Sequence, residues 1–374
     1  MTRRTAIAAA CLAAAVGIGM WTLSRSRALS YPPMAVPPDN RMSAEKAALG
    51  RWLFYDRRLS VNGSVACADC HRQAFAFSDP RALSVGATGE TTTRNAMTLT
   101  NVAYNGRYTW ANDSLKTLEQ QALVPLTSAH PLEMGILERE QPGMLSRLHA
   151  DKRYTALFRA AFPQEADPVS LANVVRAIST FVRTLVSFES PYDRYLRGDD
   201  GALGEDARRG LALFRSDALK CARCHGGVNF RMTPGHRANQ DDETVAYHNT
   251  GLYNLAGDGS YPASDRGLFD VTHEPTDMGR FKAPTLRNVA VTAPYMHDGS
   301  IATLDAVIDH YAAGGRLIAS GPNAGDGRAN PHKSDLVPGF RLTAEQKRDL
   351  LAFLDSLTDR AFLTNPAFAD PFHD

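Results

Sequence analysis

Two copies of one short pattern, a pair of cysteines followed directly by a histidine, are the residues best suited to chemistry in this chain. They are Cys67-Ala-Asp-Cys70-His71 and Cys221-Ala-Arg-Cys224-His225. The C-x-x-C-H spacing is typical of c-type haem attachment, in which each thiol forms a thioether with a haem vinyl group and the histidine binds the iron. A zinc site or redox-active thiols are the alternatives. Because the fifth cysteine, Cys11, lies in the N-terminal apolar segment, the two copies favour two covalently bound haem c groups.

The first motif is followed by a stretch with few candidates for a second axial ligand. From Arg72 to Ala129 the sequence contains no histidine and one methionine, Met97. This stretch predicts a first haem with an open sixth position, where peroxide can bind. A more distant residue, such as His130 or Met134, is the alternative that would close the position.

Cleavage of peroxide at an open haem needs a base that moves a proton from one oxygen to the other. Glu133 lies in a turn-like, apolar context that could hold it near the iron, and Gln121 precedes it on a helix-like stretch. From the residues alone, a solvated loop carboxylate and a surface glutamine explain these two side chains equally well.

The second motif has several candidate axial partners further along the chain: Met232, Met278, Met296, His297, His310 and Tyr311. Helical spacing places Leu304, Val307, Ile308 and Tyr311 on one buried face, whereas His310 points elsewhere. Tyr311 therefore faces inward. An ordinary core tyrosine with a hydrogen-bonded hydroxyl also fits this spacing, and the residues alone rank Tyr311 no higher than Met296.

Helices are the elements that must position these groups, since no alternating apolar run is long enough to predict a sheet. Helix-like stretches at 44–54 and 205–214 each lead into a C-x-x-C-H motif, which is a weak internal repeat. An amphipathic helix is expected at 171–188. Further helices are expected at 115–124, 143–162, 303–313 and 343–358. The predicted fold class is mostly α, with two tandem cytochrome c-like haem domains.

Composition and the N-terminus limit the class of protein. The 374 residues, 22% of them charged, with a net charge of +1, are typical of a soluble globular protein of about two domains and provide no basic field for nucleic acid. Arg3 and Arg4 precede an uncharged Ala-rich run, which predicts a signal peptide at 1–30 and a periplasmic location. An uncleaved N-terminal anchor is the alternative, and it is the only membrane contact we expect.

Over residues 42–357 the chain resembles the bacterial di-haem cytochrome c peroxidase and MauG family. The resemblance rests on both haem motifs, on Arg94-Asn95 followed by Thr98-Leu99, and on the motifs at 281–289 (FKAPTLRNV) and 292–299 (TAPYMHDG). It implies an N-terminal cytochrome c-like domain at 42–190, with the open, peroxide-reactive haem. It also implies a C-terminal cytochrome c-like domain at 191–374, with the electron-transfer haem.

The resemblance also assigns roles to individual residues. Gln121, Glu133 and Pro125 match residues of the pocket beside the open haem, and Trp110 matches a tryptophan that relays electrons between the haems. A calcium ion between the haems is implied as well. The residues that match its ligands supply hard oxygen donors, as calcium requires: Asn95, Thr292 and the carbonyl of Pro294.

Two departures from the peroxidase pattern point to the MauG branch. The peroxidases have methionine where this chain has Tyr311, and a distal histidine after a glycine where this chain has Gly86-Ala87-Thr88. The MauG branch has tyrosine at the first of these positions. The resemblance therefore implies that Tyr311, opposite His225, is the axial ligand of the second haem, and an anionic tyrosinate stabilises high-valent iron.

A shorter stretch, residues 101–112, resembles MbnH, the di-haem enzyme encoded with methanobactin systems, which oxidises a tryptophan of its partner MbnP to kynurenine. The implied function is a peroxidase-type oxidoreductase. It would use hydrogen peroxide to reach a bis-Fe(IV) state and oxidise a residue of an MbnP-like partner protein. One alternative is a cytochrome c peroxidase that reduces hydrogen peroxide to water with electrons from a small cytochrome or cupredoxin. Another is a non-enzymatic electron carrier with both haems closed.

Overall fold

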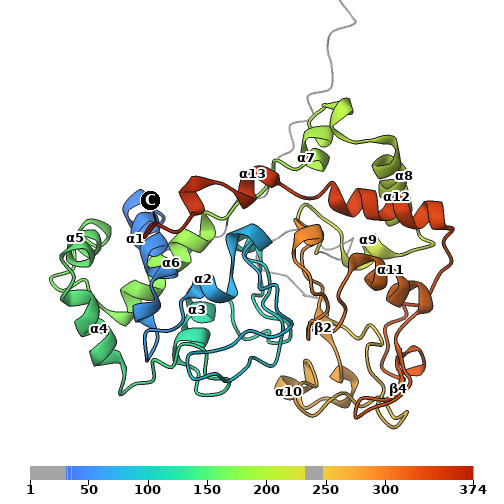
Figure 1. The fold of residues 1–374 in the computed structure, drawn as a ribbon, viewed down its shortest axis with the longest axis horizontal. Helices are drawn as coiled ribbons and strands as arrows, with labels where there is room; N and C mark the ends of the chain where they lie inside the picture. Colours follow the sequence, from blue (N-terminus) through green and yellow to red (C-terminus); the bar gives the residue numbers. More distant parts are fainter. Residues whose placement is uncertain (1–30, 32, 35, 232–246, 374) are drawn as a thin grey trace, which may run out of the picture.

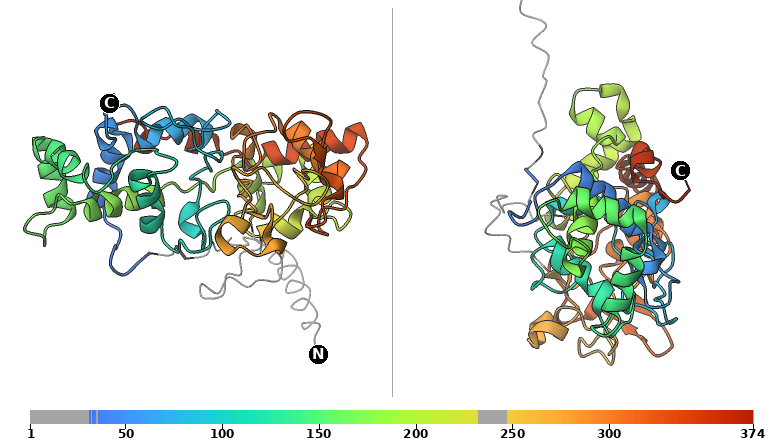
Figure 2. Two further views of the ribbon diagram at one scale, coloured as in Figure 1. Left: turned by 90° about the horizontal axis from the view of Figure 1, so that it is seen from below. Right: turned by 90° about the vertical axis from the view of Figure 1, so that its left-hand side faces the viewer.

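The computed structural model describes residues 31, 33, 34, 36–231 and 247–373. The described part is largely helical, with two small two-stranded sheets, and its two halves lie side by side along the long axis (Figures 1 and 2). The expected signal peptide at 1–30 and the candidate ligand Met232 lie outside the described residues. Within the described part, no helix is both long and apolar enough for a membrane span.

The first half is built around the crossing of α1 (Ala44–Tyr55) and α6 (Leu171–Arg183). A Cβ atom at Gly50 would lie 2.0 Å from the carbonyl oxygen of Ala177, so glycine is needed for this close approach. The other helices of this half surround that pair: α2 (Cys67–Cys70), α3 (Leu118–Thr127), α4 (Gln141–His149) and α5 (Lys152–Ala161). Apolar side chains from all these helices except α2 form one buried cluster, and part-buried α2 residues pack against it.

The second half repeats this arrangement. Helix α8 (Glu205–Arg215) packs on α12 (Ala344–Asp355), and a Cβ atom at Gly210 would lie 1.9 Å from the carbonyl oxygen of Asp349. Helix α9 (Cys221–Cys224) follows α8 just as α2 follows α1. The internal repeat predicted ahead of each haem motif is therefore a repeated crossing of two helices, and a second buried cluster surrounds it.

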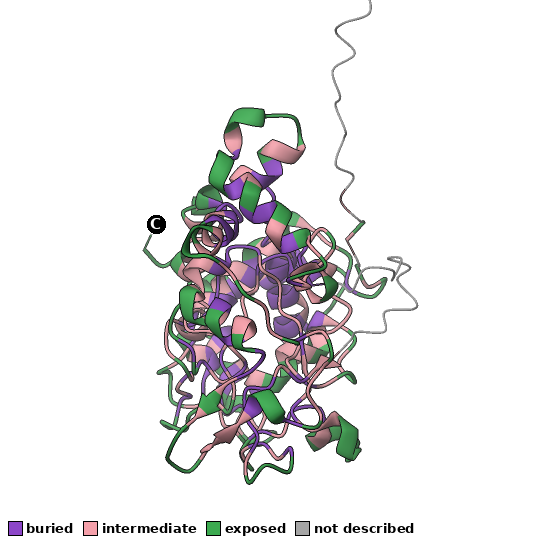
Figure 3. Cartoon of the chain, turned by 90° about the vertical axis from the view of Figure 1, so that its right-hand side faces the viewer, coloured by how far each residue is buried: buried purple, intermediate pink, exposed green. Residues whose placement is uncertain are grey.

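The remaining elements are short. They are the helices α7 (Pro191–Leu196), α10 (Phe269–Thr272), α11 (Leu304–Ala313) and α13 (Arg360–Leu363), and the paired strands β1 (Tyr247–His248) with β2 (Phe281–Lys282) and β3 (Leu317–Ile318) with β4 (Gly325–Asp326). Short 3-10 turns also occur, among them η2 (Gln73–Phe75), η3 (Val102–Tyr104) and η6 (Val289–Val291). Buried residues lie inside this framework of helices and loops, with exposed residues around it (Figure 3).

The expected helices are present, although α3 begins and ends three residues later than the helix expected at 115–124 and other elements also differ. The single helix expected at 143–162 is two helices, because Asp151 caps a new one: its side chain accepts a hydrogen bond from the backbone N–H of Arg153. The helix expected at 171–188 ends at Arg183, and Leu185 and Phe188 are buried beyond its end. The two sheets were not expected, since each strand has two residues and no alternation can be recognised over that length.

The C-terminal tail returns from the second half to the first (Figure 1). The side-chain amide of Gln73 donates to the carbonyls of Phe362 and Asn365, at 3.2 and 2.9 Å, and the Tyr55 hydroxyl donates to the carbonyl of Phe368 at 2.7 Å. The last residues of the expected domain 191–374 therefore pack on the other half. The division near residue 190 stays a prediction.

Candidate haem and peroxide site

The histidine of the first motif is oriented for metal binding. Nδ1 of His71 lies 2.9 Å from the carbonyl oxygen of Phe77. When Nδ1–H donates to that carbonyl, the lone pair of Nε2 is free for an iron. Burial lowers the pKa of His71, so the imidazole is held in the neutral form that binds metals.

The second motif has the same arrangement. Nδ1 of His225 lies 3.1 Å from the carbonyl oxygen of Phe230 and 3.1 Å from that of Pro284. Burial lowers the pKa of His225 to about 4. Both histidines therefore present Nε2, and in each half a carbonyl that follows the motif fixes the ring.

The four cysteines of the motifs form no disulfide. Burial raises the pKa of Cys67 and of Cys221 to about 12, and that of Cys70 and of Cys224 to about 11. Thiols in such surroundings lack the lowered pKa of redox-active cysteines. Among the described residues, no cluster of three or more His, Cys, Asp or Glu side chains could hold a metal ion. The motif residues fit covalent haem attachment better than a zinc or redox-thiol site.

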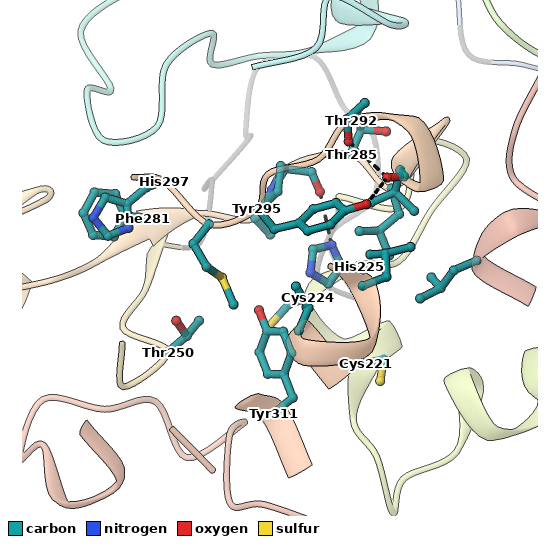
Figure 4. A pocket seen from close by; sticks show the side chains of 18 of the residues that line it. Cys221, Cys224, His225, Thr250, Phe281, Thr285, Thr292, Tyr295, His297 and Tyr311 are labelled. Atoms are coloured by element: carbon teal, nitrogen blue, oxygen red, sulfur yellow. Dashed lines mark hydrogen bonds between the residues drawn. The ribbon is translucent and has the colours of Figure 1, made fainter. Parts of the chain in front are cut away.

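A cavity of about 210 Å³ lies beside the second motif and is lined by residues of both halves. Cys221, Cys224 and His225 form part of its wall (Figure 4). Asn95 and Trp110 line it from the first half. The apolar face predicted for 303–313 is confirmed, since four of its residues line the cavity: Leu304, Val307, Ile308 and Tyr311.

Tyr311 points its hydroxyl toward Cys224 and His225 (Figure 4). No described residue forms a hydrogen bond with this hydroxyl, whereas the hydroxyl of Tyr295, in the same cavity, donates to the carbonyl of Val289 at 2.9 Å. Burial raises the pKa of Tyr311, so a phenolate there requires a cation beside it. The ordinary core tyrosine with a hydrogen-bonded hydroxyl is therefore not what the structure contains.

Of the other candidate ligands of the second haem, some line the cavity and others lie outside it. Met296 and His297 also line the cavity, and the His297 ring is stacked on Phe281 with centroids 3.6 Å apart. Met278 packs in a third apolar cluster, and His310 is buried outside the cavity lining. Met296 thus remains near Tyr311, and the structure does not bring Met278 or His310 to this cavity.

The acidic and amide residues expected beside the first haem are both half-buried. Burial raises the pKa of Glu133 to about 7. Burial also raises the pKa of Cys70, and the charge of Glu133 adds to that rise, so this carboxyl lies near the first motif. Oε1 of Gln121 is buried, and no described residue bonds to it. A solvated carboxylate and a surface glutamine do not describe these side chains.

The backbone around Glu133 is held by the segment that contains Gly86. A Cβ atom at Gly86 would lie 2.0 Å from the carbonyl oxygen of Leu132, and the N–H of Ala87 donates to the carbonyl of Glu133 at 2.7 Å. The N–H of Met134 donates to the carbonyl of Pro125 at 2.9 Å, which joins this segment to α3. The segment 86–88 therefore packs directly on the chain that carries the carboxyl.

The two residues considered as closing ligands of the first haem lie elsewhere. The side chain of His130 is 90% exposed, and its Nδ1 lies 3.8 Å from a carboxylate oxygen of Glu90. Met134 is buried in the apolar cluster of the first half. Neither is in a position that indicates an axial ligand.

The expected calcium ligands are brought together at the cavity. Asn95, Thr292 and Pro294 all line it. The amide nitrogen of Asn95 donates to the carbonyls of Arg81 and Ala82, at 3.0 and 3.1 Å, so its Oδ1 points away from those carbonyls. Among the described residues no donor bonds to this oxygen, which leaves it available to a cation.

Two polar residues of this cavity were not singled out from the sequence. His248 on β1 and Lys282 on β2 both line it, Lys282 is 2% exposed, and Nε2 of His248 is buried without a described partner. Their strands are too short to predict, so the sequence contained no signal that would pair them.

The comparisons with known proteins agree with this geometry. A family model described as "Di-haem cytochrome c peroxidase" matches residues 44–201. Methylamine utilization protein MauG of Methylorubrum extorquens is 36% identical over 331 residues, which cover 88% of this chain and 83% of that protein. Cytochrome-c peroxidase IdrP1 of Denitromonas iodatirespirans is 35% identical, and the match covers 98% of this chain and 93% of that protein.

Solved structures extend the comparison to the fold. The crystal structure of a MauG-like protein associated with microbial copper homeostasis is 48% identical and has a TM-score of 0.88. The match covers 94% of this chain and 99% of that one. The diheme peroxidase BthA from Burkholderia thailandensis, 24% identical with a TM-score of 0.64, shares the fold.

Proposed function

The chain belongs to the di-haem cytochrome c peroxidase family, and we propose that it is a MauG-type enzyme that uses hydrogen peroxide to oxidise a residue of a partner protein. The residue we propose is a tryptophan and the product kynurenine, in an MbnP-like partner. The 48% identity to a MauG-like protein associated with copper homeostasis supports this choice over a general peroxidase.

The observation that carries the proposal is Tyr311. It is a half-buried phenol that faces the second haem motif and has no hydrogen bond to a described residue. An anionic oxygen ligand favours the oxidised states of iron, whereas the methionine of the peroxidases favours the reduced state. A second haem bound by His225 and Tyr311 is suited to storing an oxidising equivalent rather than accepting electrons from a donor protein.

When bound, the two haems would supply peroxide cleavage at one iron and storage of oxidising equivalents at both. The surrounding residues would then transfer protons and orient the peroxide. Glu133 would accept a proton from one oxygen of the peroxide and return it to the other, and its pKa of about 7 suits both steps at neutral pH. The Gln121 amide orients the peroxide beside it.

Trp110 is proposed as the electron relay between the two sites. Its indole N–H donates to the carbonyl of Asn95 at 2.8 Å, and both residues line the cavity beside the second motif. We also propose that calcium binds Asn95, Thr292 and the carbonyl of Pro294, which provide oxygen donors. The calcium ion would fix the segment that holds the indole.

The partner need not enter a pocket, because electrons can pass from its surface to the haems through Trp110 and the protein. The reaction balances with two peroxides for each tryptophan. Each peroxide accepts two electrons and two protons and becomes two waters, while the tryptophan loses four electrons and four protons in all and takes its two new oxygen atoms from water, which gives N-formylkynurenine. Hydrolysis then releases formate and leaves kynurenine.

The proposed location is the periplasm, with 1–30 as the export signal.

The alternative function, reduction of peroxide to water with electrons from a small cytochrome or cupredoxin, is favoured by one observation. The peroxidase IdrP1 is nearly as similar to this chain as MauG is.

The test is to incubate the holoenzyme with hydrogen peroxide and the candidate partner encoded beside its gene, followed by tandem mass spectrometry of the partner. We expect one tryptophan to be converted to kynurenine only when enzyme and peroxide are both present. An unmodified partner, together with rapid oxidation of a reduced small cytochrome or cupredoxin, would establish the peroxidase alternative.

A further inference from the structure

A second short pattern occurs once in each half of the molecule. Residues 96–102 read Ala-Met-Thr-Leu-Thr-Asn-Val, and residues 283–289 read Ala-Pro-Thr-Leu-Arg-Asn-Val. The last valine of each copy begins a 3-10 turn, η3 or η6. The asparagine before each turn is left-handed, with φ of 55° at Asn101 and 59° at Asn288. The two segments are therefore a structural repeat, in addition to the repeated helix crossing.

Each copy contains a threonine whose hydroxyl is bonded in the same way. The hydroxyl of Thr98 donates to the carbonyl of Ala76 at 2.5 Å. The hydroxyl of Thr285 donates to the carbonyl of Asn229 at 2.6 Å. In both copies the hydroxyl oxygen also accepts a hydrogen bond from the backbone N–H two residues further along, at 3.1 and 3.2 Å. Each threonine thus ties its own segment to a loop that follows a haem motif.

The carbonyl bound by each threonine belongs to the residue immediately before a phenylalanine, and the carbonyl of that phenylalanine faces a haem-binding histidine. Nδ1 of His71 lies 2.9 Å from the carbonyl oxygen of Phe77. Nδ1 of His225 lies 3.1 Å from that of Phe230. Figure 4 shows Thr285 and His225 in the wall of one cavity. In both halves, adjacent carbonyls therefore serve the threonine and the histidine.

The two phenylalanines have a backbone conformation that needs support from other segments. The angle φ is 57° at Phe77 and 52° at Phe230, in the left-handed region that bulky side chains rarely adopt. Such a conformation persists only where the surrounding structure determines it. The threonine hydrogen bond to the preceding carbonyl is a contact of this kind, and it is present in both halves.

We propose that Thr98 and Thr285 are positioning residues for the two haem-binding histidines. Each hydroxyl fixes the peptide before a left-handed phenylalanine and so directs the phenylalanine carbonyl at Nδ1 of the histidine. A histidine that donates Nδ1–H to a well-placed carbonyl is a more basic ligand at Nε2, and a more basic ligand stabilises oxidised iron. The inference rests on the two-haem enzyme proposed above and explains how the fold can adjust each iron separately.

The experiment compares holoprotein variants without peroxide or a partner. Thr98→Val removes the hydroxyl at nearly constant volume, so the Fe–His stretching band of the ferrous first haem should move to lower frequency in resonance Raman spectra. Thr285→Val should shift the ferric low-spin electron paramagnetic resonance signal of the second haem. Each variant should leave the signal of the other haem unchanged. Serine at either position keeps a hydroxyl and should restore the wild-type spectra.

The matched control is Thr180→Val. Thr180 is buried in α6, and its hydroxyl donates to the carbonyl of Arg176 at 2.8 Å, within the same helix. This variant therefore loses a hydroxyl–carbonyl hydrogen bond that serves neither histidine, and its spectra should match those of the wild type. Covalent haem content, measured as the pyridine haemochrome, reports whether each variant assembles.

Wild-type signals from both haems in assembled Thr98→Val and Thr285→Val would overturn the inference. Equal changes in Thr180→Val, or a change at both haems from one variant, would overturn it as well. Each half is tested separately, so one assembled valine variant is decisive, and alanine at the same position repeats the test where valine prevents haem uptake. Each comparison is made with the wild type in the same state, so failure of the tryptophan chemistry would leave the result interpretable.

Discussion

The indole N–H of Trp110 donates a hydrogen bond to the backbone carbonyl of Asn95, with 2.8 Å between nitrogen and oxygen. The N–H of Asn95 in turn donates to the carbonyl of His297 at 2.7 Å, and the carbonyl of Trp110 accepts from Lys282 at 2.7 Å. The proposed relay is therefore bonded to both halves of the molecule. A residue held in this way keeps a fixed distance to two cofactors, as electron transfer between them requires.

We expect Tyr311→Phe to change the second haem from low spin to high spin in the ferric protein, because the sixth ligand is lost. The matched control is Tyr295→Phe, which removes a hydroxyl from the same cavity, but one that bonds to the carbonyl of Val289. Electron paramagnetic resonance at low temperature separates the two outcomes. If Tyr311→Phe retains the low-spin signal, another residue is the ligand, and Met296 is the next to substitute.

Replacement of Glu133 with Gln should slow the reaction with peroxide by roughly 100-fold, since the amide cannot accept the proton. Burial raises the pKa of Glu133 to about 7, and only the ionised carboxyl is a base, so the wild-type rate should rise with pH through a midpoint near that value. In the variant this rise should disappear. Stopped-flow absorbance in the haem bands measures both effects.

The control for this experiment is Glu138→Gln, which changes an exposed carboxyl five residues further along. Its rate and pH profile should match those of the wild type. Equal rates for Glu133→Gln and Glu138→Gln would mean that another group transfers the proton.

The sequence predicted the parts of this molecule that depend on local spacing. The C-x-x-C-H motifs, the helices that lead into them and the inward face of 303–313 follow from periodicity and residue type. Whether Tyr311 lacked a hydrogen bond could not be predicted, because that depends on the side chains that reach it from other segments. The same applies to Glu133, whose backbone is held by the close packing of Gly86 against Leu132.

The pairing of β1 with β2 is a further example of what the sequence did not contain. Tyr247 is opposite Lys282 and His248 is opposite Phe281, more than thirty positions apart, in strands of two residues each. Such contacts arise from the tertiary packing of loops, for which there is no periodic signal.

Gly86→Ala should slow peroxide turnover and lower the thermal stability, because the added Cβ would come within 2.0 Å of the Leu132 carbonyl oxygen. Forcing a methyl group into a packed site costs about 1–3 kcal/mol, and here the displaced segment carries Glu133. Gly143→Ala is the control, since nothing lies within 4 Å of its Cβ position. Calorimetry measures the thermal stability of both variants, and stopped-flow kinetics measures their reaction with peroxide. Equal stabilities and equal rates would show that the 86–88 segment does not position the carboxyl of Glu133.

Removal of calcium with a chelator should alter the ferric electron paramagnetic resonance spectra of both haems, because the proposed site joins Asn95 of the first half to Thr292 and Pro294 of the second. Asn95→Ala should reproduce the effect, and added calcium should reverse it only in the wild type. Analysis of the purified protein for bound calcium tests the site directly. A protein without calcium whose spectra do not respond to the chelator would exclude it.

Arg183→Met should destabilise the first half and slow peroxide turnover together. Arg183 is 2% exposed and forms two hydrogen bonds with the carboxylate of Glu119, at 2.7 and 2.8 Å. Glu119 belongs to α3, two residues before Gln121, so this ion pair fixes the helix that carries the buried amide. Removal of one partner of a buried pair costs about 3–5 kcal/mol, because the other charge is left uncompensated.

Arg176→Met, two turns earlier on α6, is the matched control for Arg183. Its guanidinium is partly exposed and lies 3.6 Å from Glu165, and exposed pairs of this kind contribute about 0–1 kcal/mol. In denaturant unfolding of the holoproteins, the midpoint concentration should therefore be clearly lower for Arg183→Met than for Arg176→Met. A double variant, Arg183→Met with Glu119→Gln, should recover part of the loss, because no charge then remains unpaired. If the double variant is no more stable than Arg183→Met, packing rather than charge explains the effect.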